Sequence, residues 1–226
     1  MSNLYMLATP LGNTDDITVR GLHILKNTSV VACEDTRVSA RLLGLLGIQE
    51  HKKFISVNEH ARAHHFVKVK EALAQGSDVV YMTDAGTPGI ADPGGALVAY
   101  IKKECPDVVV IPIPGPSAII AALSIAGVHA DQFVFFGFPP HKNKRNAYFR
   151  RLAEVSQEFT VVLFESTYRI KKTLAELAGV LQPRQQIIVA RELTKKFETI
   201  YYTTAGTLDA NAIKEKGEFA LVISKA

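Results

Sequence analysis

The sequence has little cysteine, no tryptophan and no long apolar run. Neither Cys33 nor Cys105 has metal-ligand spacing, and two cysteines do not make a disulfide framework, so we expect both to be reduced thiols. No stretch has the roughly 20 apolar residues of a membrane span. The segment Met1–Leu4 lacks the basic region and apolar core of a secretion signal. We therefore expect a cytoplasmic protein without a membrane partner.

Several functional motifs are also missing. The sequence has no G-x-x-x-x-G-K-[ST] loop, no G-x-G-x-x-G between a strand and a helix, and no G-x-S-x-G around a nucleophile. His60, His64 and His65 lack the glutamate of a zinc-protease motif, and a solvated helix face is the favoured interpretation. These absences argue against a polyphosphate site and a serine nucleophile, and no metal site is predicted.

What the chain does have is a regular alternation of apolar strands and amphipathic helices. Its 226 residues, 47% hydrophobic and 21% charged, are enough for one large or two modest domains. The formal net charge of +4 permits a nucleic-acid partner without requiring one. The expected strands are continuous apolar runs: Leu4–Ala8, Ser29–Cys33, Phe54–Val57, Val79–Met82, Val108–Ile111, Phe133–Phe138, Thr160–Glu165, Gln186–Arg191, Thr199–Thr203 and Glu218–Ile223.

The pattern predicts an α/β protein with two lobes. Continuous apolar strands joined by helices indicate a mostly parallel N-terminal sheet covered on both faces. The C-terminal sheet is expected to be mixed, because Thr199–Thr203 has the pattern of an added antiparallel strand. The proline-rich segment Pro112–Ala118 is the expected boundary, which gives an N-terminal domain of residues 1–113 and a C-terminal domain of residues 114–226.

Polar loops follow most of the expected strands. In parallel sheets such loops meet at one edge, so we expect a ligand cleft between the lobes. The stretch Val79–Gly95 is the most informative, because a buried strand ends at Asp84 and glycines follow. A carboxylate at a strand end suits an uncharged or cationic ligand, such as a ribose hydroxyl or a sulfonium, better than a polyphosphate. The alternative is a tight turn whose aspartate only caps a helix.

These residues resemble a known family. The segments that carry the resemblance are Leu7–Asn13, Cys33–Arg37, Thr83–Gly94, Pro114–Ala118, Phe164–Ser166 and Arg191–Lys195. In this order they are similar to the tetrapyrrole methylase superfamily, from Leu4 to about Ile223, and within it to the ribosomal RNA branch. The resemblance implies two α/β lobes, S-adenosylmethionine as cofactor and a homodimer. The implied cofactor contacts are Thr9, Pro10, Asp84, Ala85, Gly86, Thr87, Ile90, Ser117, Ala118, Phe164, Leu193 and Gly217.

The implied reaction is 2′-O-methylation of a cytidine in small-subunit (16S) ribosomal RNA, with the 30S subunit as partner. Two alternatives stay open: methylation of a small tetrapyrrole, and a non-catalytic ribosome-assembly factor that keeps the fold. Relatives that modify tetrapyrroles usually carry G-x-G-P-G after the first strand. This chain has Ala8–Asn13 there, which favours RNA. Many relatives also continue past the last strand with a small helical extension that this sequence does not include.

Polar residues at the strand ends are the candidates for the substrate side. Glu34 and Asp35 are the expected proton acceptor or ribose ligand and Arg37 a phosphate ligand, the alternative being an ion pair within the loop. The acid-free basic segment Lys142–Arg151 is either a solvated helix face or a phosphate-contacting patch. The predicted RNA contacts are Asn58, Glu59, Lys142, Lys144, Arg145 and Lys195.

Overall fold

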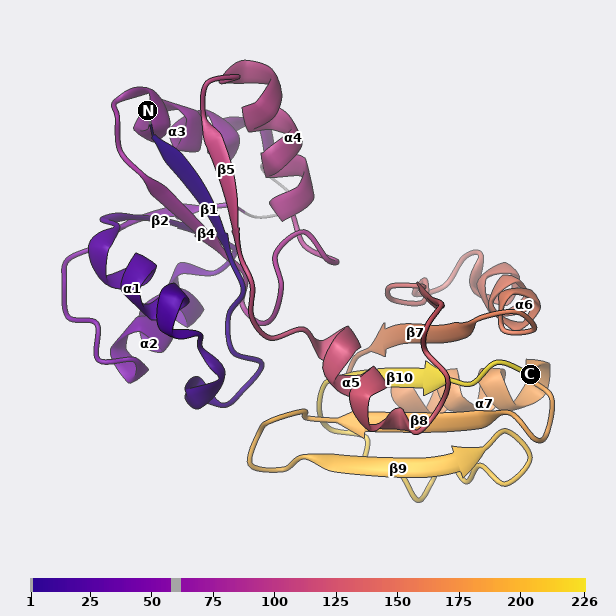
Figure 1. Ribbon diagram of the computed structural model, residues 1–226. Coiled ribbons are helices and arrows are strands. Elements are labelled where there is room, and N and C mark those ends of the chain that lie inside the picture. The colour runs from indigo at the N-terminus through magenta and orange to yellow at the C-terminus, as the bar shows by residue number, and fades with distance from the viewer. Residues whose placement is uncertain (1, 58–61) are drawn as a thin grey trace. The chain divides into compact units, whose positions relative to one another are not determined.

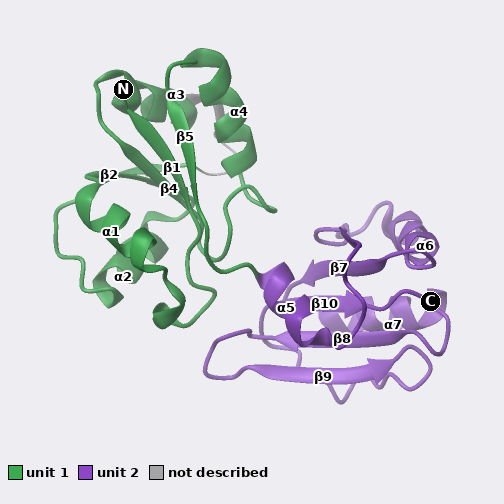
Figure 2. Cartoon of the chain, viewed as in Figure 1, with its two compact units in different colours: residues 1–117 green, residues 118–226 purple. Residues whose placement is uncertain are grey.

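The structure, a computed structural model, describes residues 2–57 and 62–226. It separates into two compact units, residues 1–117 and 118–226 (Figure 2). Each unit contains one five-stranded sheet with helices on both of its faces (Figure 1). No helix in the described part of the chain combines the length and the apolar character needed to cross a bilayer.

Unit 1 is an entirely parallel sheet with the strand order β3-β2-β4-β1-β5. Its strands are β1 (Asn3–Leu7), β2 (Val30–Cys33), β3 (Lys53–Ser56), β4 (Val79–Met82) and β5 (Val109–Ile113). Its helices are a short 3₁₀ helix (Thr14–Asp16), α1 (Val19–Asn27), α2 (Thr36–Leu45), α3 (Arg62–Ala74) and α4 (Gly94–Glu104). The predicted parallel N-terminal sheet is confirmed.

The alternation of side chains along each strand decides which helices cover which face. Val79 and Tyr81 of β4 pack in the cluster with α3 and α4, whereas Val80 and Met82 pack with α1 and α2. Both faces are therefore apolar, which is why β2 and β4 consist of apolar residues and one tyrosine, Tyr81. The edge strand β5 runs through Pro112, whose missing N–H costs nothing where no further strand pairs.

Unit 2 is a mixed sheet with the order β6-β7-β10-β8-β9. Its strands are β6 (Phe133–Phe135), β7 (Thr160–Glu165), β8 (Gln186–Arg191), β9 (Thr199–Thr204) and β10 (Phe219–Ile223), and its helices are α5 (Ala118–Ala126), α6 (Arg145–Val155) and α7 (Ile170–Val180). Strands β6 and β7 are parallel, β10 is antiparallel to both β7 and β8, and β9 is antiparallel to β8. The predicted mixed C-terminal sheet is confirmed, with β6 shorter than expected because the backbone turns at Gly137, whose φ is +66°.

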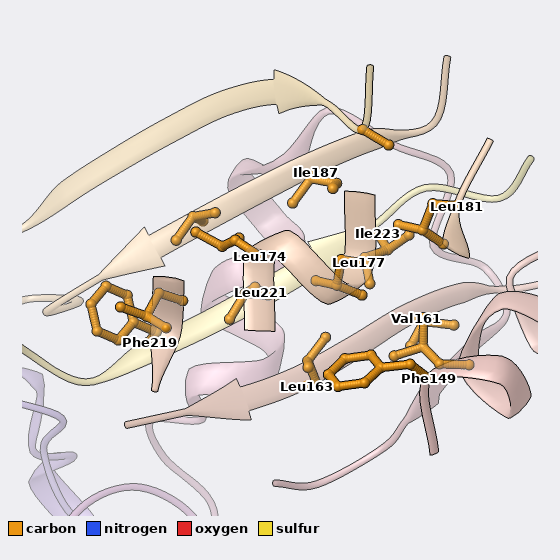
Figure 3. Packing of buried hydrophobic residues seen from close by; sticks show 14 of the residues in the cluster. Phe149, Val161, Leu163, Leu174, Leu177, Leu181, Ile187, Phe219, Leu221 and Ile223 are labelled. Carbon is orange, nitrogen blue, oxygen red and sulfur yellow. The ribbon is translucent and has the colours of Figure 1, made fainter. Parts of the chain in front are cut away.

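The larger core of unit 2 lies between the sheet and helices α6 and α7. Figure 3 shows Leu174 and Leu177 of α7 beside Leu221 and Ile223 of β10 and Ile187 of β8. Helix α5 covers the opposite face through a second apolar cluster. Because β7 and β8 are both antiparallel to β10, the carboxyl ends of β6, β7 and β8 share one edge of the sheet. The loops of interest in this unit leave from that edge.

Candidate functional site

The loops after β1 and β4 are joined by an antiparallel bridge. The Thr9 N–H donates to the Gly86 carbonyl at 2.9 Å, and the Gly86 N–H donates back to Thr9 at 3.1 Å. The Thr9 hydroxyl points into the protein, donating to the Thr83 carbonyl at 3.2 Å, and Thr9 is 0% exposed. The neighbouring Pro10 is buried as well. The structure thus brings the predicted Thr9 and Gly86 together, and the Thr9 side chain serves to hold the loops.

The loop after β5 joins the same arrangement. The Thr87 hydroxyl donates to the Pro116 carbonyl at 2.9 Å, and a Cβ on Gly115 would lie 3.1 Å from the Cβ of Ala8. Gly86 has a φ of +84°, a left-handed conformation that favours glycine. Three loops that are distant in sequence are therefore packed backbone against backbone at the carboxyl ends of β1, β4 and β5.

The tip of the β4 loop faces solvent. Asp84, Ala85 and Ile90, all predicted cofactor contacts, are exposed. The Asp84 carboxylate accepts a hydrogen bond from the backbone N–H of Asp35 at 3.3 Å, so it lies where the loops after β2 and β4 meet. This edge therefore presents a carboxylate to a ligand.

A second aspartate, which the sequence reasoning did not single out, shapes the β4 loop. Asp92 accepts backbone N–H groups from Gly89 at 3.0 Å, Ile90 at 2.9 Å and Gly94 at 2.6 Å, and the Tyr81 hydroxyl at 3.3 Å. The signal that could have found it is an aspartate one residue before Pro93, at the start of a helix, where a carboxylate commonly accepts backbone N–H groups. Asp92 thus fixes the loop that presents Asp84.

The strand-end acids make this edge electronegative. The pKa of the Cys33 thiol is raised to about 11, mainly by burial and in addition by the carboxylates of Asp84, Asp35 and Glu34, while a hydrogen bond with Ser39 opposes the rise. The negative charges of three carboxylates from two loops therefore act on a thiol at the end of β2. Such an edge favours a cationic ligand and disfavours a polyphosphate.

Asp35 and Arg37 form the ion pair that was the alternative to a catalytic role. The Arg37 guanidinium donates from Nη2 to Asp35 Oδ2 at 2.7 Å and from Nε to Oδ1 at 3.1 Å, and the Arg37 N–H donates to Oδ1 at 2.8 Å. These hydrogen bonds from the Arg37 side chain and backbone lower the pKa of Asp35 to about 2. Asp35 also caps the N-terminus of α2, which makes it a helix cap rather than a base.

The remaining residues predicted for the substrate side of unit 1 are only partly placed. Glu34 is half-buried at the end of β2, and its carbonyl accepts the Ser56 hydroxyl at 3.5 Å. Asn58 and Glu59 lie outside the described residues. Arg37 is 89% exposed along its side chain, with one end held by Asp35.

In unit 2, the predicted cofactor contacts lie at the carboxyl-terminal edge of the sheet. The Phe164 ring packs against Phe135, with centroids 4.8 Å apart, and Leu193 joins the apolar cluster under α5. Gly217 has a φ of +143°, and a Cβ there would come within 2.9 Å of Glu192, so this position requires glycine. The Thr167 hydroxyl donates to the Gly217 carbonyl at 2.7 Å and accepts its N–H at 2.9 Å.

The junction of the two units contains the other two predicted contacts. Ser117 and Ala118 are both half-buried, and α5 begins at Ala118.

Lys195, a predicted RNA contact in the loop after β8, donates to Glu192 at 3.3 Å and to Glu218 at 2.8 Å. Burial lowers the pKa of Lys195, but the hydrogen bonds and charges of these two glutamates outweigh it and leave the pKa above its ordinary value. Lys195 is therefore a cation anchored both to its own loop, at Glu192, and to Glu218, the residue before β10.

Arg145 corrects the prediction for the basic segment. It is 4% exposed and its guanidinium is fully engaged, donating to Glu176 at 2.7 Å, to the Thr173 hydroxyl at 2.5 Å and to the Pro140 carbonyl at 2.9 Å. The guanidinium cannot reach a phosphate from there, so Arg145 is not an RNA contact. Lys142 and Lys144 are exposed, as a phosphate contact requires.

The part of the chain that the structure describes contains no group of three or more His, Cys, Asp or Glu residues able to hold a metal ion. The donors described at the edge of unit 1 are carboxylates, which suit a ligand with a positive charge.

Comparison with known proteins gives relatives along nearly the whole chain. A profile of the Tetrapyrrole (Corrin/Porphyrin) Methylases matches residues 3–209. The protein named Ribosomal RNA small subunit methyltransferase I of Neisseria meningitidis is 40% identical over 99% of this chain and 76% of its own length. Proteins of the same name from Synechocystis and Escherichia coli O157:H7 are 39% and 35% identical, with 80% and 77% of their own lengths covered.

Solved structures show the same fold at much lower identity. Uroporphyrin III C-methyl transferase from Thermus thermophilus aligns with a TM-score of 0.70 at 16% identity, over 99% of this chain and 98% of that one. The cobalamin biosynthetic enzyme cobalt precorrin-4 methyltransferase aligns with a TM-score of 0.69 at 20% identity, over 98% and 94%. With the family profile and the relatives in agreement, the chain belongs to the tetrapyrrole (corrin/porphyrin) methylase family.

Proposed function

We propose that this protein transfers a methyl group from S-adenosylmethionine to a cytidine 2′-hydroxyl in small-subunit (16S) ribosomal RNA. The observation that carries the proposal is the identity of 35–40% to proteins named Ribosomal RNA small subunit methyltransferase I, over almost the full chain. A ribose hydroxyl is a target by which a protein distinguishes RNA from DNA. The proposal includes action in the cytoplasm, on the 30S subunit or its RNA, by a homodimer.

The residues at the edge of unit 1 fit this cofactor. Asp84 and Glu34 supply the negative charge that a sulfonium prefers, whereas the charge of Asp35 is already paired with Arg37. Gly86 holds the loop in the conformation that presents Asp84, because its φ of +84° favours glycine and its N–H and carbonyl both bond to Thr9. In unit 2, Phe164, Leu193 and Gly217 form the second part of the proposed contact set.

The chemistry asked of the protein is mainly positioning. S-adenosylmethionine, when bound, supplies a methyl group already activated by the sulfonium charge. The chain then has to orient the ribose hydroxyl, exclude water and accept one proton. Asp35 is unsuited to that last task, because its pKa of about 2 leaves it too weak a base. Glu34 is the remaining candidate for the proton acceptor, and the anchored cation Lys195 is a candidate phosphate ligand.

The test is transfer of a tritiated methyl group to RNA. Purified protein is incubated with labelled S-adenosylmethionine and either 30S subunits or free 16S ribosomal RNA from cells that lack the modification. Cofactor binding is measured separately by calorimetry. We expect binding, and label at one cytidine ribose in at least one of the two RNA substrates.

Two other outcomes would contradict the proposal. Absence of cofactor binding would favour a non-catalytic assembly factor. Cofactor binding with label on an added tetrapyrrole, and none on either RNA, would favour the small-molecule alternative. Size-exclusion chromatography with light scattering then measures whether the protein is a dimer.

A further inference from the structure

An exposed aromatic residue lies on a turn beside the carboxyl end of β7. Tyr168 is 82% exposed, and its φ of +67° is in the left-handed region that a large side chain rarely adopts. Such a conformation persists only where the surroundings impose it, and it is concentrated at functional positions. The turn therefore presents a flat ring to solvent from a constrained backbone position.

The neighbours of Tyr168 hold the turn on both sides. Thr167 exchanges two hydrogen bonds with Gly217, at 2.7 and 2.9 Å. Arg169 donates to the fully buried carboxylate of Glu165 at 2.6 Å, and also to the Pro139 carbonyl at 3.0 Å. The residue before Tyr168 and the residue after it are thus anchored to different elements, which restrains the backbone of Tyr168 from both sides.

The same anchors bring a basic loop beside the turn. Because β6 and β7 are parallel, the loop that follows β6 leaves from the same edge as Tyr168. Arg169 binds this loop at the Pro139 carbonyl, and Arg145 binds it at the Pro140 carbonyl. The loop then carries the exposed Lys142 and Lys144.

The charge of this surface is positive. The sequence contains no acid between Asp131 and Glu154. The two arginines that bind the loop hold carboxylates of their own, Arg169 that of Glu165 and Arg145 that of Glu176 at 2.7 Å. The ammonium groups of Lys142 and Lys144 are therefore the charges that the loop offers to a partner.

We propose that Tyr168, Lys142 and Lys144 form a contact platform for a single-stranded segment of RNA, with a base stacked on the Tyr168 ring and phosphates bound by the two lysines. The combination of an exposed aromatic face and nearby cations is the one that recognises unpaired nucleotides, since every base has a face to stack and every linkage a negative charge. This inference rests on the proposed function and adds to it a location for substrate binding outside the cofactor contacts.

The first experiment measures binding directly. Fluorescence anisotropy of the full chain, saturated with S-adenosylmethionine, is followed with a labelled 12-nucleotide single-stranded RNA, an RNA duplex of the same length and an acidic peptide. We expect Tyr168→Ala to weaken single-stranded RNA binding roughly 5- to 150-fold, the range for loss of one stacked base, and Tyr168→Phe to retain it. The control Tyr202→Ala removes another exposed tyrosine, on β9, and should leave the affinity for single-stranded RNA unchanged.

The second experiment uses salt. Each phosphate contact on a single strand contributes about 0.7 to the slope of log affinity against log salt. The double variant Lys142→Ala/Lys144→Ala should lower that slope by about 1.4. The matched double variant Lys102→Ala/Lys103→Ala makes the same charge change on α4 and should leave the slope unaltered. Calorimetry of the cofactor should give the same affinity for all variants.

The outcomes separate this inference from the proposed function. If the unaltered protein methylates RNA while Tyr168→Ala and the Lys142/Lys144 variant keep its affinity and KM, the platform is refuted and the function stands. If the unaltered protein binds single-stranded RNA through these residues but transfers no methyl group, the platform stands and the function fails. Tighter binding of the duplex or the acidic peptide than of the single strand would refute the proposed partner. Tyr168→Gly, which removes the ring and relieves the backbone, keeps the test valid if Tyr168→Ala is poorly folded.

Discussion

Replacing Asp92 should loosen the β4 loop and weaken cofactor binding without removing a cofactor contact. The carboxylate has four hydrogen-bond donors. Two of them, the Gly94 N–H and the Tyr81 hydroxyl, belong to buried residues, and each would lose its partner at a cost of about 1–3 kcal/mol. The Gly89 and Ile90 N–H groups are on exposed residues and can turn to water. Because Asp92 itself is half-buried, we expect about 2–4 kcal/mol for Asp92→Ala.

The measurement is urea unfolding, followed by calorimetry of S-adenosylmethionine. With a slope of about 2 kcal/mol per molar urea, that loss lowers the unfolding midpoint of unit 1 by roughly 1–2 M. If the cofactor has to order the loosened loop when it binds, every 1.4 kcal/mol of that ordering cost weakens Kd by about tenfold. We therefore expect Asp92→Ala to weaken cofactor affinity at least tenfold. Asp92→Asn keeps one acceptor and should lose about half as much.

The control is Asp107→Ala, which removes an exposed acid after α4 and should leave both quantities unchanged. An unfolding midpoint and a Kd within error of the unaltered protein for Asp92→Ala would refute the reasoning. The loop would then be held by its glycines and prolines alone.

Three further outcomes are expected. Arg145→Met leaves the half-buried Glu176 carboxylate and the buried Thr173 hydroxyl without their arginine, and it should cost about 3–5 kcal/mol, or about 12–20 °C in the melting temperature if unit 2, about 110 residues, unfolds by itself. Arg150→Met, at an exposed position of the same helix, should cost under about 2 °C, and equal shifts would contradict the buried network. Asp84→Ala should weaken S-adenosylmethionine binding roughly tenfold by calorimetry at unchanged thermal stability, and unaltered affinity would overturn the placement of that charge. The pKa of Asp35 is lowered, so the contribution of this carboxylate to stability is present above its ordinary pKa of 3.8 and disappears as the pH falls toward 2. Titration of the Asp35 carboxyl by NMR should give a midpoint of about 2 that rises in Arg37→Gln, and a midpoint near 3.8 in the unaltered protein would disprove the ion pair.

The sequence was sufficient for the architecture because the signals are local. Continuous apolar runs such as Val79–Met82 predict strands buried on both faces, and their alternation with amphipathic helices predicts the parallel sheet. The family resemblance rests on loops at strand ends, where backbone conformation restricts the residue type. Element ends were less predictable: β5 continues through Pro112, since an edge strand tolerates a missing N–H.

Individual side chains were harder to place, because pairing across the fold leaves no local pattern. Arg145 reads as one more cation in a basic segment, and only the packing of α6 against α7 brings it to Glu176 and buries it. Asp92 differs from Asp84 in the structure by its four donors, which come from its own loop and from Tyr81. Tyr168 became notable through its backbone φ, which the sequence does not encode by itself.

The position of β10 in its sheet has a consequence for biosynthesis. Among the described strands it comes last in the sequence, yet it lies between β7 and β8 and pairs with both. Until residues 219–223 have left the ribosome, the second sheet exists only as two separate strand pairs, β6 with β7 and β8 with β9. The parallel sheet of unit 1 is complete once Ile113 has emerged. During translation, unit 1 should therefore fold before the sheet of unit 2 is complete. A nascent chain stalled before Phe219 would expose apolar surface of the unfinished second sheet to chaperones and proteases.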